Sequence, residues 1–280
     1  EKGEVDWADW LSAEDLNALK EVPGMVTFDE PMFGTFMVKM NNQVGHASDP
    51  HVRKAIAYAF DYDAVIEAMQ GRADLLEGPL STPCPGFAEG LPVYRLDMDK
   101  AKEELAQSQW PEGGFEIEYV YVTGLVIEEQ IGLILLDQLS QLGITVNMVP
   151  LLWPDMKARF ADVNTSPELV AVYSGTDYAD ADNFLDAQYH SSQAGTWSAA
   201  SHYANDQIDT WLDEARSVVD QAERDEIYRQ IQEKLLEDCV EVWVHSERHH
   251  HVWHDYVHRD LSPIMSAWHW PVWMEDKESA

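Results

Sequence analysis

An apolar segment followed by acidic and aromatic residues is the stretch of this chain best suited to hold a ligand. Leu169 to Val172 is apolar, and Tyr173 to Tyr178 follows it, with Gly175 and Asp177 inside. This pattern predicts a buried strand that opens onto an acidic loop. Ligands usually bind at loops just past the carboxyl ends of strands in open α/β sheets. Asp177 is therefore the first candidate binding residue, although a solvated loop acid would show the same pattern.

Histidines near the carboxyl end form a second candidate site, here for a metal ion. They are His245, His249, His250, His251, His254 and His258. Spacings of four could gather imidazoles on a helix, and alternation could do so on a strand. The valines among them favour strands, and neither Cys239 nor Glu247 completes a familiar ligand spacing. We expect solvent-facing histidines on a β-ribbon and no metal site.

A metal-dependent hydrolase that uses these histidines with Asp180 and Asp182 is the alternative from another functional class. The sequence contains no HExxH helix, no GxSxG elbow and no glycine-rich phosphate loop. We therefore expect a binding protein, not an enzyme, and no cofactor.

The charge of the chain limits its partners. The 280 residues include 51 acids and 18 bases, which give a formal net charge of −33. Such a charge argues against nucleic acid or an anionic membrane surface as a partner. In molar salt the Debye length falls to about 3 Å, so an acidic surface is tolerated there. The acids are spread along the whole chain, and this favours a saline habitat for an exported protein or a halophile.

Other compositional features concern compartment and cross-linking. No run of 18 apolar residues predicts a transmembrane helix, and Glu1 to Glu4 is unlike a signal peptide. We expect that an export signal has been removed or that the chain starts within a longer protein. Cys84 and Cys239 form either one disulfide or two buried thiols.

The elements that must position Asp177 alternate between strand and helix patterns. A strand over 115–122, a helix over 128–142 and a strand over 144–149 predict a right-handed β-α-β unit. A helix over 153–160 and a strand over 169–173 lead into the acidic loop. The other predicted elements are strands within 25–41, helices starting at Asp49 and at Asp61 or Asp63, a long loop over 78–92, helices over 208–219 and 227–236, and a strand over 240–244. The fold class is α/β.

A series of landmarks in this order resembles the extracellular solute-binding proteins of oligopeptide, dipeptide and nickel uptake, family 5. The series spans roughly Gly3 to Ser262, and each motif alone is weak. The landmarks are Asn41-Asn42, Asp49 with Val52 to Ile56, Ala59 to Asp61, Tyr94 with Asp97 and Lys100-Ala101, Leu142 to Val146, Asp177-Tyr178 with Phe184-Leu185, Tyr203 to Asn205 with Asp209, and Arg224 with Tyr228 and Gln232.

The resemblance implies the fold of one lobe of a class II periplasmic binding protein, a mixed sheet flanked by helices. Family members are about twice as long, so this chain resembles their carboxyl-terminal portion. Residues 1–34 correspond to the end of the first lobe, 35–257 to the second ligand-binding lobe, and 258–280 to the return to the first lobe.

The resemblance also implies the substrate-binding subunit of an ABC importer. Such a subunit is periplasmic or extracellular, is monomeric, and associates with the membrane through permease subunits. The cargo is a peptide or a related amine-bearing solute captured between two lobes. A metal chelate or an oligosaccharide is the alternative cargo within the same family.

Residue roles follow from the same resemblance. Asp177 matches the aspartate that pairs with the α-amino group of a bound peptide, a charge-assisted contact that is strong in a closed cleft. Tyr173 and Gly175 match backbone that runs alongside the peptide as an added strand, and Tyr178 lies at the end of that edge. Trp153 matches a pocket aromatic, although a packed tryptophan at a helix start fits equally well.

The chain departs from the family pattern at two positions. Ser174 stands where the family has a tryptophan, and Ala171 stands where it has an arginine. Contacts to the carboxylate end of a peptide are therefore in doubt, with Arg159 as the candidate substitute.

Overall fold

The protein is a mixed α/β molecule in which one long strand runs through two bodies. The computed structural model describes residues 5–9, 11, 13–175, 178–259 and 272–274. The main sheet has the order β1-β8-β3-β7-β5-β6, and β2 and β4 also pair with β8. The strands are β1 (Trp7–Asp9), β2 (Met25–Pro31), β3 (Gly34–Met40), β4 (Ala73–Leu75), β5 (Glu116–Val122), β6 (Thr145–Leu151), β7 (Leu169–Gly175), β8 (Glu241–His254), β9 (Val257–Arg259) and β10 (Val272–Met274).

The helices α2, α3, α5, α6, α8 and α9 lie where the sequence predicts helices, whereas α7 forms where an acidic loop was expected. Short polar residues cap several of the helices. Asp49, Asp61 and Asp97 each accept a backbone N–H bond at the start of α2, α3 and α4, as N-cap residues do. The helices are α1 (Ala13–Lys20), α2 (Pro50–Ala59), α3 (Tyr62–Met69), α4 (Met98–Leu105), α5 (Val126–Ser140), α6 (Trp153–Phe160), α7 (Ala181–Tyr189), α8 (Asp206–Ser217) and α9 (Gln221–Asp238).

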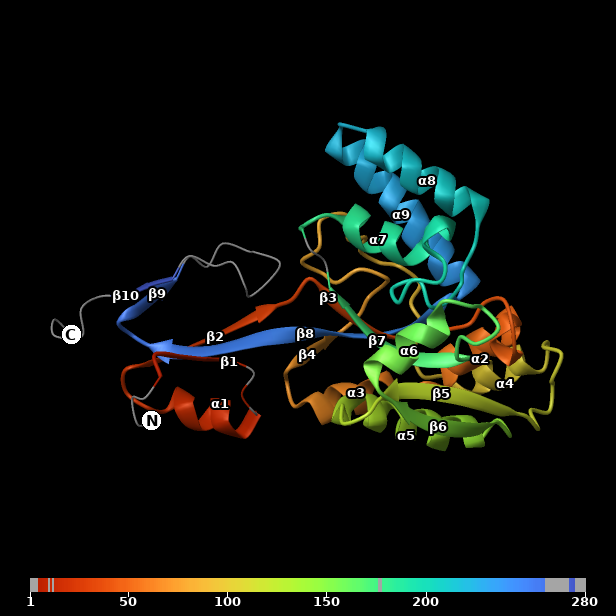
Figure 1. Cartoon of the computed structure of the whole chain (residues 1–280), viewed down its shortest axis with the longest axis horizontal. Coiled ribbons are helices and arrows are strands. Elements are labelled where there is room, and N and C mark those ends of the chain that lie inside the picture. The colour runs from red at the N-terminus through yellow and green to blue at the C-terminus, as the bar shows by residue number, and fades with distance from the viewer. Residues whose placement is uncertain (1–4, 10, 12, 176–177, 260–271, 275–280) are drawn as a thin grey trace.

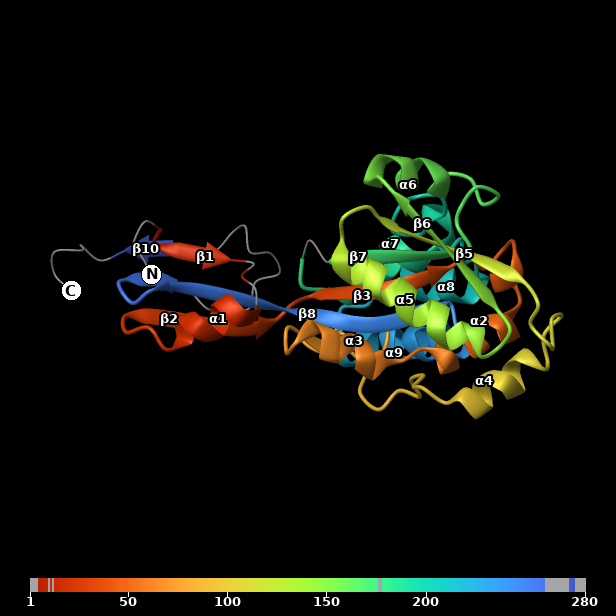
Figure 2. The same cartoon turned by 90° about the horizontal axis from the view of Figure 1, so that it is seen from below.

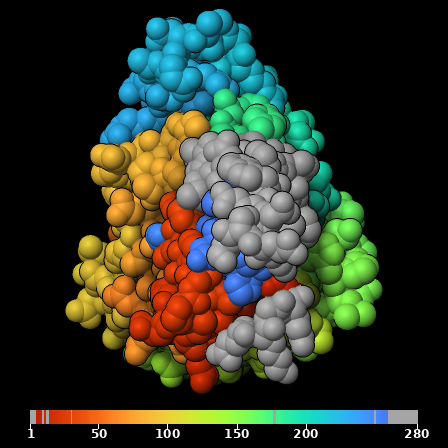
Figure 3. All heavy atoms as spheres, turned by 90° about the vertical axis from the view of Figure 1, so that its left-hand side faces the viewer, coloured from red at the N-terminus to blue at the C-terminus, as the bar shows by residue number. Residues whose placement is uncertain are grey.

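The two bodies differ in size and share β8 (Figures 1 and 2). The small body contains β1, α1, β2, β9, β10 and the carboxyl half of β8, and the large body contains the remaining described elements. Residues 248–254 of β8 pair with β2, whereas residues 241–245 pair with β3. Seen from the small-body end, the side chains of the first strands and α1 stand in front, and the α8–α9 pair projects above them (Figure 3).

The predicted β-α-β unit is confirmed. β5 and β6 pair in parallel from Glu116 with Thr145 to Val122 with Leu151. The helix α5 between them lies close to the sheet because Gly132 has no side chain; a Cβ there would stand 2.6 Å from the ring of Tyr119. A methyl group could not fit at that distance, so this glycine sets the separation of helix and sheet.

The large body packs helices on both faces of its sheet. On the face covered by α2 to α5, buried apolar residues such as Val38, Ile117 and Ala171 meet Ile56 and Leu135. On the opposite face, α7 to α9 cover Met37 and Trp243, and α6 covers Val120 and Val172. The alternation along β3, β5 and β7 thus assigns successive residues to opposite cores.

The α6–α9 face also contains a buried ion pair. Lys39 and Glu241 face each other across β3 and β8, and the Lys39 Nζ lies 3.0 Å from Glu241 Oε2 and 2.7 Å from Gln188 Oε1. The Tyr189 hydroxyl donates to the second Glu241 oxygen and accepts from Trp243 Nε1 at 3.0 Å. Burial lowers the pKa of Lys39, while the charge of Glu241 opposes that shift.

The expectation of solvent-facing histidines was wrong for His245, His250 and His251, while His254 and His258 are half-buried, and the strand itself is confirmed. His245 and His251 are fully buried, and His250 is 8% exposed. The predicted strand over 240–244 continues to His254, so these residues lie inside the sheet that joins the two bodies. Cys84 and Cys239 are free and buried, which rules out a disulfide between them in this structure.

Candidate functional site

The candidate site is the edge of the large body where three strands end. β7 pairs in parallel with β5, which pairs in parallel with β6, so their carboxyl ends lie on one side. A helix follows each strand: α5 begins at Val126, α6 at Trp153 and α7 at Ala181. Such an edge of an open α/β sheet is where ligands bind most often.

This edge lies at the junction of the two bodies. Gly34, the first residue of β3, pairs with Gly175, the last residue of β7. The segment between β2 and β3 is tied to β8 at the same place, because Met32 N donates to Glu247 O at 3.1 Å and Ser246 Oγ donates to Met32 O at 3.0 Å. The end of β7 therefore faces the point at which the chain passes between bodies.

Apolar side chains are unusually exposed around this edge. Leu125 is 47% exposed, Leu152 is 60% exposed and Tyr178 is 47% exposed. They come from the segments that follow β5, β6 and β7, respectively. Exposed apolar groups that gather at one place mark binding surfaces more often than scattered ones do.

Tyr173 and Gly175 lie on the last residues of β7, as the sequence predicts. A Cβ at Gly34 would stand 2.2 Å from the Tyr173 hydroxyl, so the phenol ring lies across that glycine. Burial, and then the charge of Glu247, raise the pKa of Tyr173. Gly175 is exposed and pairs with Gly34 on the β3 side, while the pairing of β7 with β5 stops at Val170, so the edge of Gly175 away from β3 is the open one.

Asp177, the first candidate of the sequence, lies outside the described residues. Its neighbour Tyr178 is described, and the Tyr178 hydroxyl donates to Asp182 Oδ2 at 3.3 Å. Burial, and then the carboxylate of Asp182, raise the pKa of Tyr178. The role of Asp177 therefore stays a prediction.

Trp153 begins α6 beside the same edge and is partly exposed. Its ring meets Trp197 edge-on at 5.8 Å between centroids, and the Lys157 ammonium lies 5.9 Å from its centroid. It also packs on the small core that contains Phe160. This placement of Trp153 agrees with a residue that lines a binding pocket and equally with one that packs at the start of a helix.

Arg159, the candidate substitute for the missing arginine, is already paired. Its Nη1 and Nη2 lie 3.0 and 2.5 Å from the two oxygens of Glu118, and its Nε donates to Thr165 O at 2.8 Å. These contacts fix the guanidinium beside β5. The guanidinium of Arg159 therefore pairs with Glu118 and is not free to bind the carboxylate end of a peptide.

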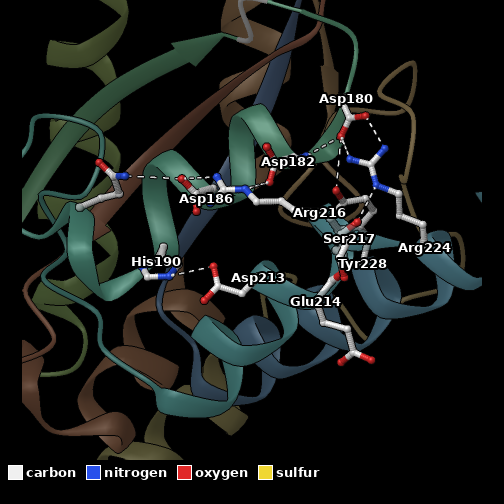
Figure 4. Close-up of polar contacts among 12 residues, drawn as sticks. Asp180, Asp182, Asp186, His190, Asp213, Glu214, Arg216, Ser217, Arg224 and Tyr228 are labelled. Carbon is white, nitrogen blue, oxygen red and sulfur yellow. Dashed lines mark hydrogen bonds and ion pairs between the residues drawn. The ribbon is translucent and has the colours of Figure 1, made fainter. Parts of the chain in front are cut away.

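Two arginines hold the first turn of α7, immediately after the candidate loop (Figure 4). Asp180 caps α7 by accepting from Asp182 N at 2.9 Å, and the same carboxylate lies 2.7 and 2.8 Å from Nη1 and Nη2 of Arg224 on α9. Arg216 on α8 reaches Asp182 Oδ1 at 2.8 Å and Asp186 Oδ2 at 2.7 Å. The acids next to Asp177 are therefore paired, and they are not a merely solvated loop.

Sequence analysis found Arg224 only as a family landmark and missed Arg216. The available signal was two arginines, each within one turn of a helix end, and a segment rich in acids that precedes both helices in the chain. Sequence spacing cannot show that α8 and α9 turn these arginines toward α7.

The described residues contain no group of three or more His, Cys, Asp or Glu placed to hold a metal ion. None of the helices in this part of the chain combines the length and hydropathy required to span a bilayer.

Comparison with known proteins decides the family. The model of the bacterial extracellular solute-binding proteins, family 5 Middle, matches residues 1–196 of the 280. The chain belongs to this family. Members of family 5 are extracellular solute-binding proteins, and the fold of this chain is that of a lobe of a class II periplasmic binding protein, as the resemblance implies.

Individual relatives match this family-5 chain over only part of their own length. The probable D,D-dipeptide-binding periplasmic protein DdpA of Escherichia coli is 25% identical over 245 residues, which are 87% of this chain and 46% of the relative. The periplasmic oligopeptide-binding protein OppA of Salmonella typhimurium is 24% identical over 239 residues, which are 81% of this chain and 42% of the relative. The chain thus spans about half the length of the curated relatives that it matches.

Solved structures establish the family-5 fold independently of sequence identity. HbpA2 from Haemophilus parasuis superposes with a TM-score of 0.86 at 20% identity, over 98% of this chain and 54% of that one. AppA from Bacillus subtilis, solved with a nonapeptide, has a TM-score of 0.81 at 18% identity. The match covers 98% of this chain and 57% of AppA. At such identities the likeness concerns the fold alone.

Proposed function

We propose that the full-length protein is the solute-binding subunit of an ABC importer and captures a peptide or a related amine-bearing solute between two lobes. Family membership and the peptide-binding names of several relatives support this proposal. The observation that carries it is the meeting of three strand ends, rimmed by exposed apolar side chains, at the junction of two bodies.

Within this proposal, the edge of β7 recognises the cargo. The backbone of Tyr173 and Gly175 pairs with the peptide as an added strand. Asp177 accepts from the free amine, and Tyr178 and Trp153 line the space for side chains. A buried carboxylate is suited to an ammonium because charge-assisted bonds are stronger than neutral ones.

The proposed organisation extends beyond the described residues. Residues 1–34 and 258–280 belong to the first lobe and 35–257 to the second, with residues 248–254 of β8 pairing with β2 of the small body. The part of the full-length protein outside this chain completes the first lobe and the cleft. The protein works as a monomer in the periplasm or outside the cell and docks on permease subunits at the membrane. Nucleic acid is not a partner, because the net charge of −33 repels it.

Calorimetry on the full-length protein tests the role of Asp177. Trialanine should bind, and N-acetyl-trialanine, which lacks the ammonium, should bind far more weakly. Asp177→Asn should weaken the binding of trialanine by about 2–5 kcal/mol, the usual loss when one partner of a buried charge pair is removed. Asp137→Asn, an exposed acid on α5, is the control and should change binding by less than about 0.5 kcal/mol.

The alternatives give different results in the same protein. Equal affinity of Asp177→Asn and the parent for trialanine would show that Asp177 does not bind the amine. Mass spectrometry of the co-purified ligand would then distinguish an oligosaccharide from a metal chelate. Stoichiometric metal together with hydrolysis of the cargo would support the hydrolase alternative.

A further inference from the structure

We propose that Arg224 is a positioning residue for Tyr178 to Asp182, the described part of the segment between β7 and α7, and acts through Asp180 without touching the cargo. The inference rests on the proposed function only in placing the cargo at that segment. Arg224 and Asp180 make two parallel contacts of 2.7 and 2.8 Å, and their side chains are 19% and 23% exposed. Paired contacts of this kind fix direction as well as distance.

Asp180 connects Arg224 to the start of α7 because its carboxylate both pairs with Arg224 and caps the helix. Its Oδ1 accepts from Asp182 N at 2.9 Å and thereby caps α7, and Tyr228 Oη lies 3.4 Å from the same oxygen. Tyr178 is held to the same helical turn through Asp182. The position of Asp180 therefore sets where the first turn of α7 lies relative to the end of β7.

Arg224 is itself held in place from a third helix. Its Nε donates to Ala215 O on α8 at 3.1 Å, and its guanidinium carbon lies 5.2 Å from the centre of the Tyr228 ring. Arg216 on α8 supports the same turn from the other side through Asp182 and Asp186 (Figure 4). The start of α7 is thus held in place by contacts with α8 and α9, whereas β7 is held in place by its pairing with neighbouring strands.

Charge and position predict opposite effects on an amine-bearing ligand. Replacing Arg224 by Gln removes a positive charge near the site, and by charge alone this strengthens the binding of a cation. If Arg224 positions the segment, the same substitution weakens binding because the segment no longer holds its binding geometry. The sign of the change therefore separates the two roles.

Arg229→Gln is the matched control for Arg224→Gln in the full-length protein. Arg229 lies on the same helix, is 40% exposed and pairs with Glu233 at 3.1 Å, so the change in charge is the same. In hydrogen exchange of the unliganded protein, the amides from Tyr178 to Asp182 should exchange about tenfold faster in Arg224→Gln than in Arg229→Gln. Equal exchange rates in the two variants would overturn the proposal.

Affinity for trialanine gives a second, independent measurement. Arg224→Gln should bind it at least about tenfold more weakly than Arg229→Gln does, and tighter binding would overturn the positioning role. If Arg224→Gln does not fold, Arg224→Lys, which keeps the charge without the paired geometry, should show the same changes to a smaller degree. If the parent protein does not bind trialanine, the peptide proposal fails, while hydrogen exchange still decides the role of Arg224.

Discussion

The two faces of the large body bury ionisable groups in different ways. On the α6–α9 face, Lys39 and Glu241 are completely buried and paired with each other. On the α2–α5 face, Glu128 and His245 are buried without an ion pair in the structure. A paired charge can stay charged in the interior, whereas an unpaired group becomes neutral through a shift of its pKa.

Glu128 and His245 on the α2–α5 face illustrate this rule in both directions. Burial raises the pKa of Glu128 to about 7, against the hydrogen bond from Val122 N. Burial also lowers the pKa of His245 to about 4, and its ring stacks on Phe36 at 5.0 Å. The α2–α5 face also buries the Arg53 side chain, which donates to the carbonyl oxygens of Ala47, Ser48, Asp238 and Cys239. The contrast between the two faces therefore concerns the carboxylate and imidazole groups of Glu241, Glu128 and His245, and not every buried ionisable group.

The largest expected effect comes from breaking the Lys39–Glu241 pair. Lys39→Met should cost about 3–5 kcal/mol of unfolding free energy, because it leaves the Glu241 carboxylate buried and uncompensated. Adding Glu241→Leu should restore most of that loss. On the other face, Leu135→Ala should cost about 2–5 kcal/mol, with no second deletion that restores it. Urea denaturation measures all three variants, and a cost under about 1 kcal/mol for Lys39→Met would contradict the comparison.

Glu128→Gln should stabilise the protein above neutral pH. The folded protein keeps the Glu128 proton up to a pH of about 7, whereas the unfolded chain releases it near 4.5. Stability from this group is therefore complete below pH 4.5 and is lost as the pH rises to about 7. At pH 8 the variant should gain about 2–3 kcal/mol over the parent, and at pH 4.5 almost nothing.

The exposed neighbour Glu129→Gln is the control for Glu128→Gln and should show no such dependence on pH. Thermal unfolding of the variants and the parent from pH 4.5 to 8 provides the measurement. A constant difference between Glu128→Gln and the parent across this range would show that Glu128 is charged inside the protein.

His245→Phe should have the opposite pH dependence. The pKa falls from 6.5 to about 4 on folding, so the stability that depends on a neutral His245 is complete above 6.5 and is lost as the pH falls toward 4. The difference in unfolding free energy between His245→Phe and the parent should therefore favour the variant by about 1–2 kcal/mol more at pH 5 than at pH 8. His254→Gln, at a half-buried histidine of the same strand, is the control. An unchanged difference between the two pH values would argue that His245 has a partner in solution.

The smallest expected effect separates surface charge from buried charge. With a net charge of −33, the melting temperature should rise by several degrees between dilute buffer and molar sodium chloride as repulsion is screened. The cost of Lys39→Met should not change with salt, because buried pairs are screened far less. A falling melting temperature would contradict the expectation of a saline habitat.

Much of the fold could be predicted because local patterns and the structure agree. Caps at Asp49 and Asp61, the parallel pair around α5 and the strand that starts at Leu169 all follow from residue type and spacing. The burial of His245, His250 and His251 could not be predicted, since it depends on which strands lie on either side of β8. The pairing of Arg216 and Arg224 with α7 depends on how the helices are oriented, and the spacing of residues in the sequence does not determine that orientation.

The long strand β8 has a consequence for the order in which the protein folds during synthesis. Among the described strands, β1, β2 and β4 pair with β8 and with no other strand. These three leave the ribosome well before residue 241, so their hydrogen-bonding edges stay open until β8 emerges. Open edges of this kind invite pairing with other chains. A nascent chain stalled before β8 should therefore be the species most dependent on chaperones.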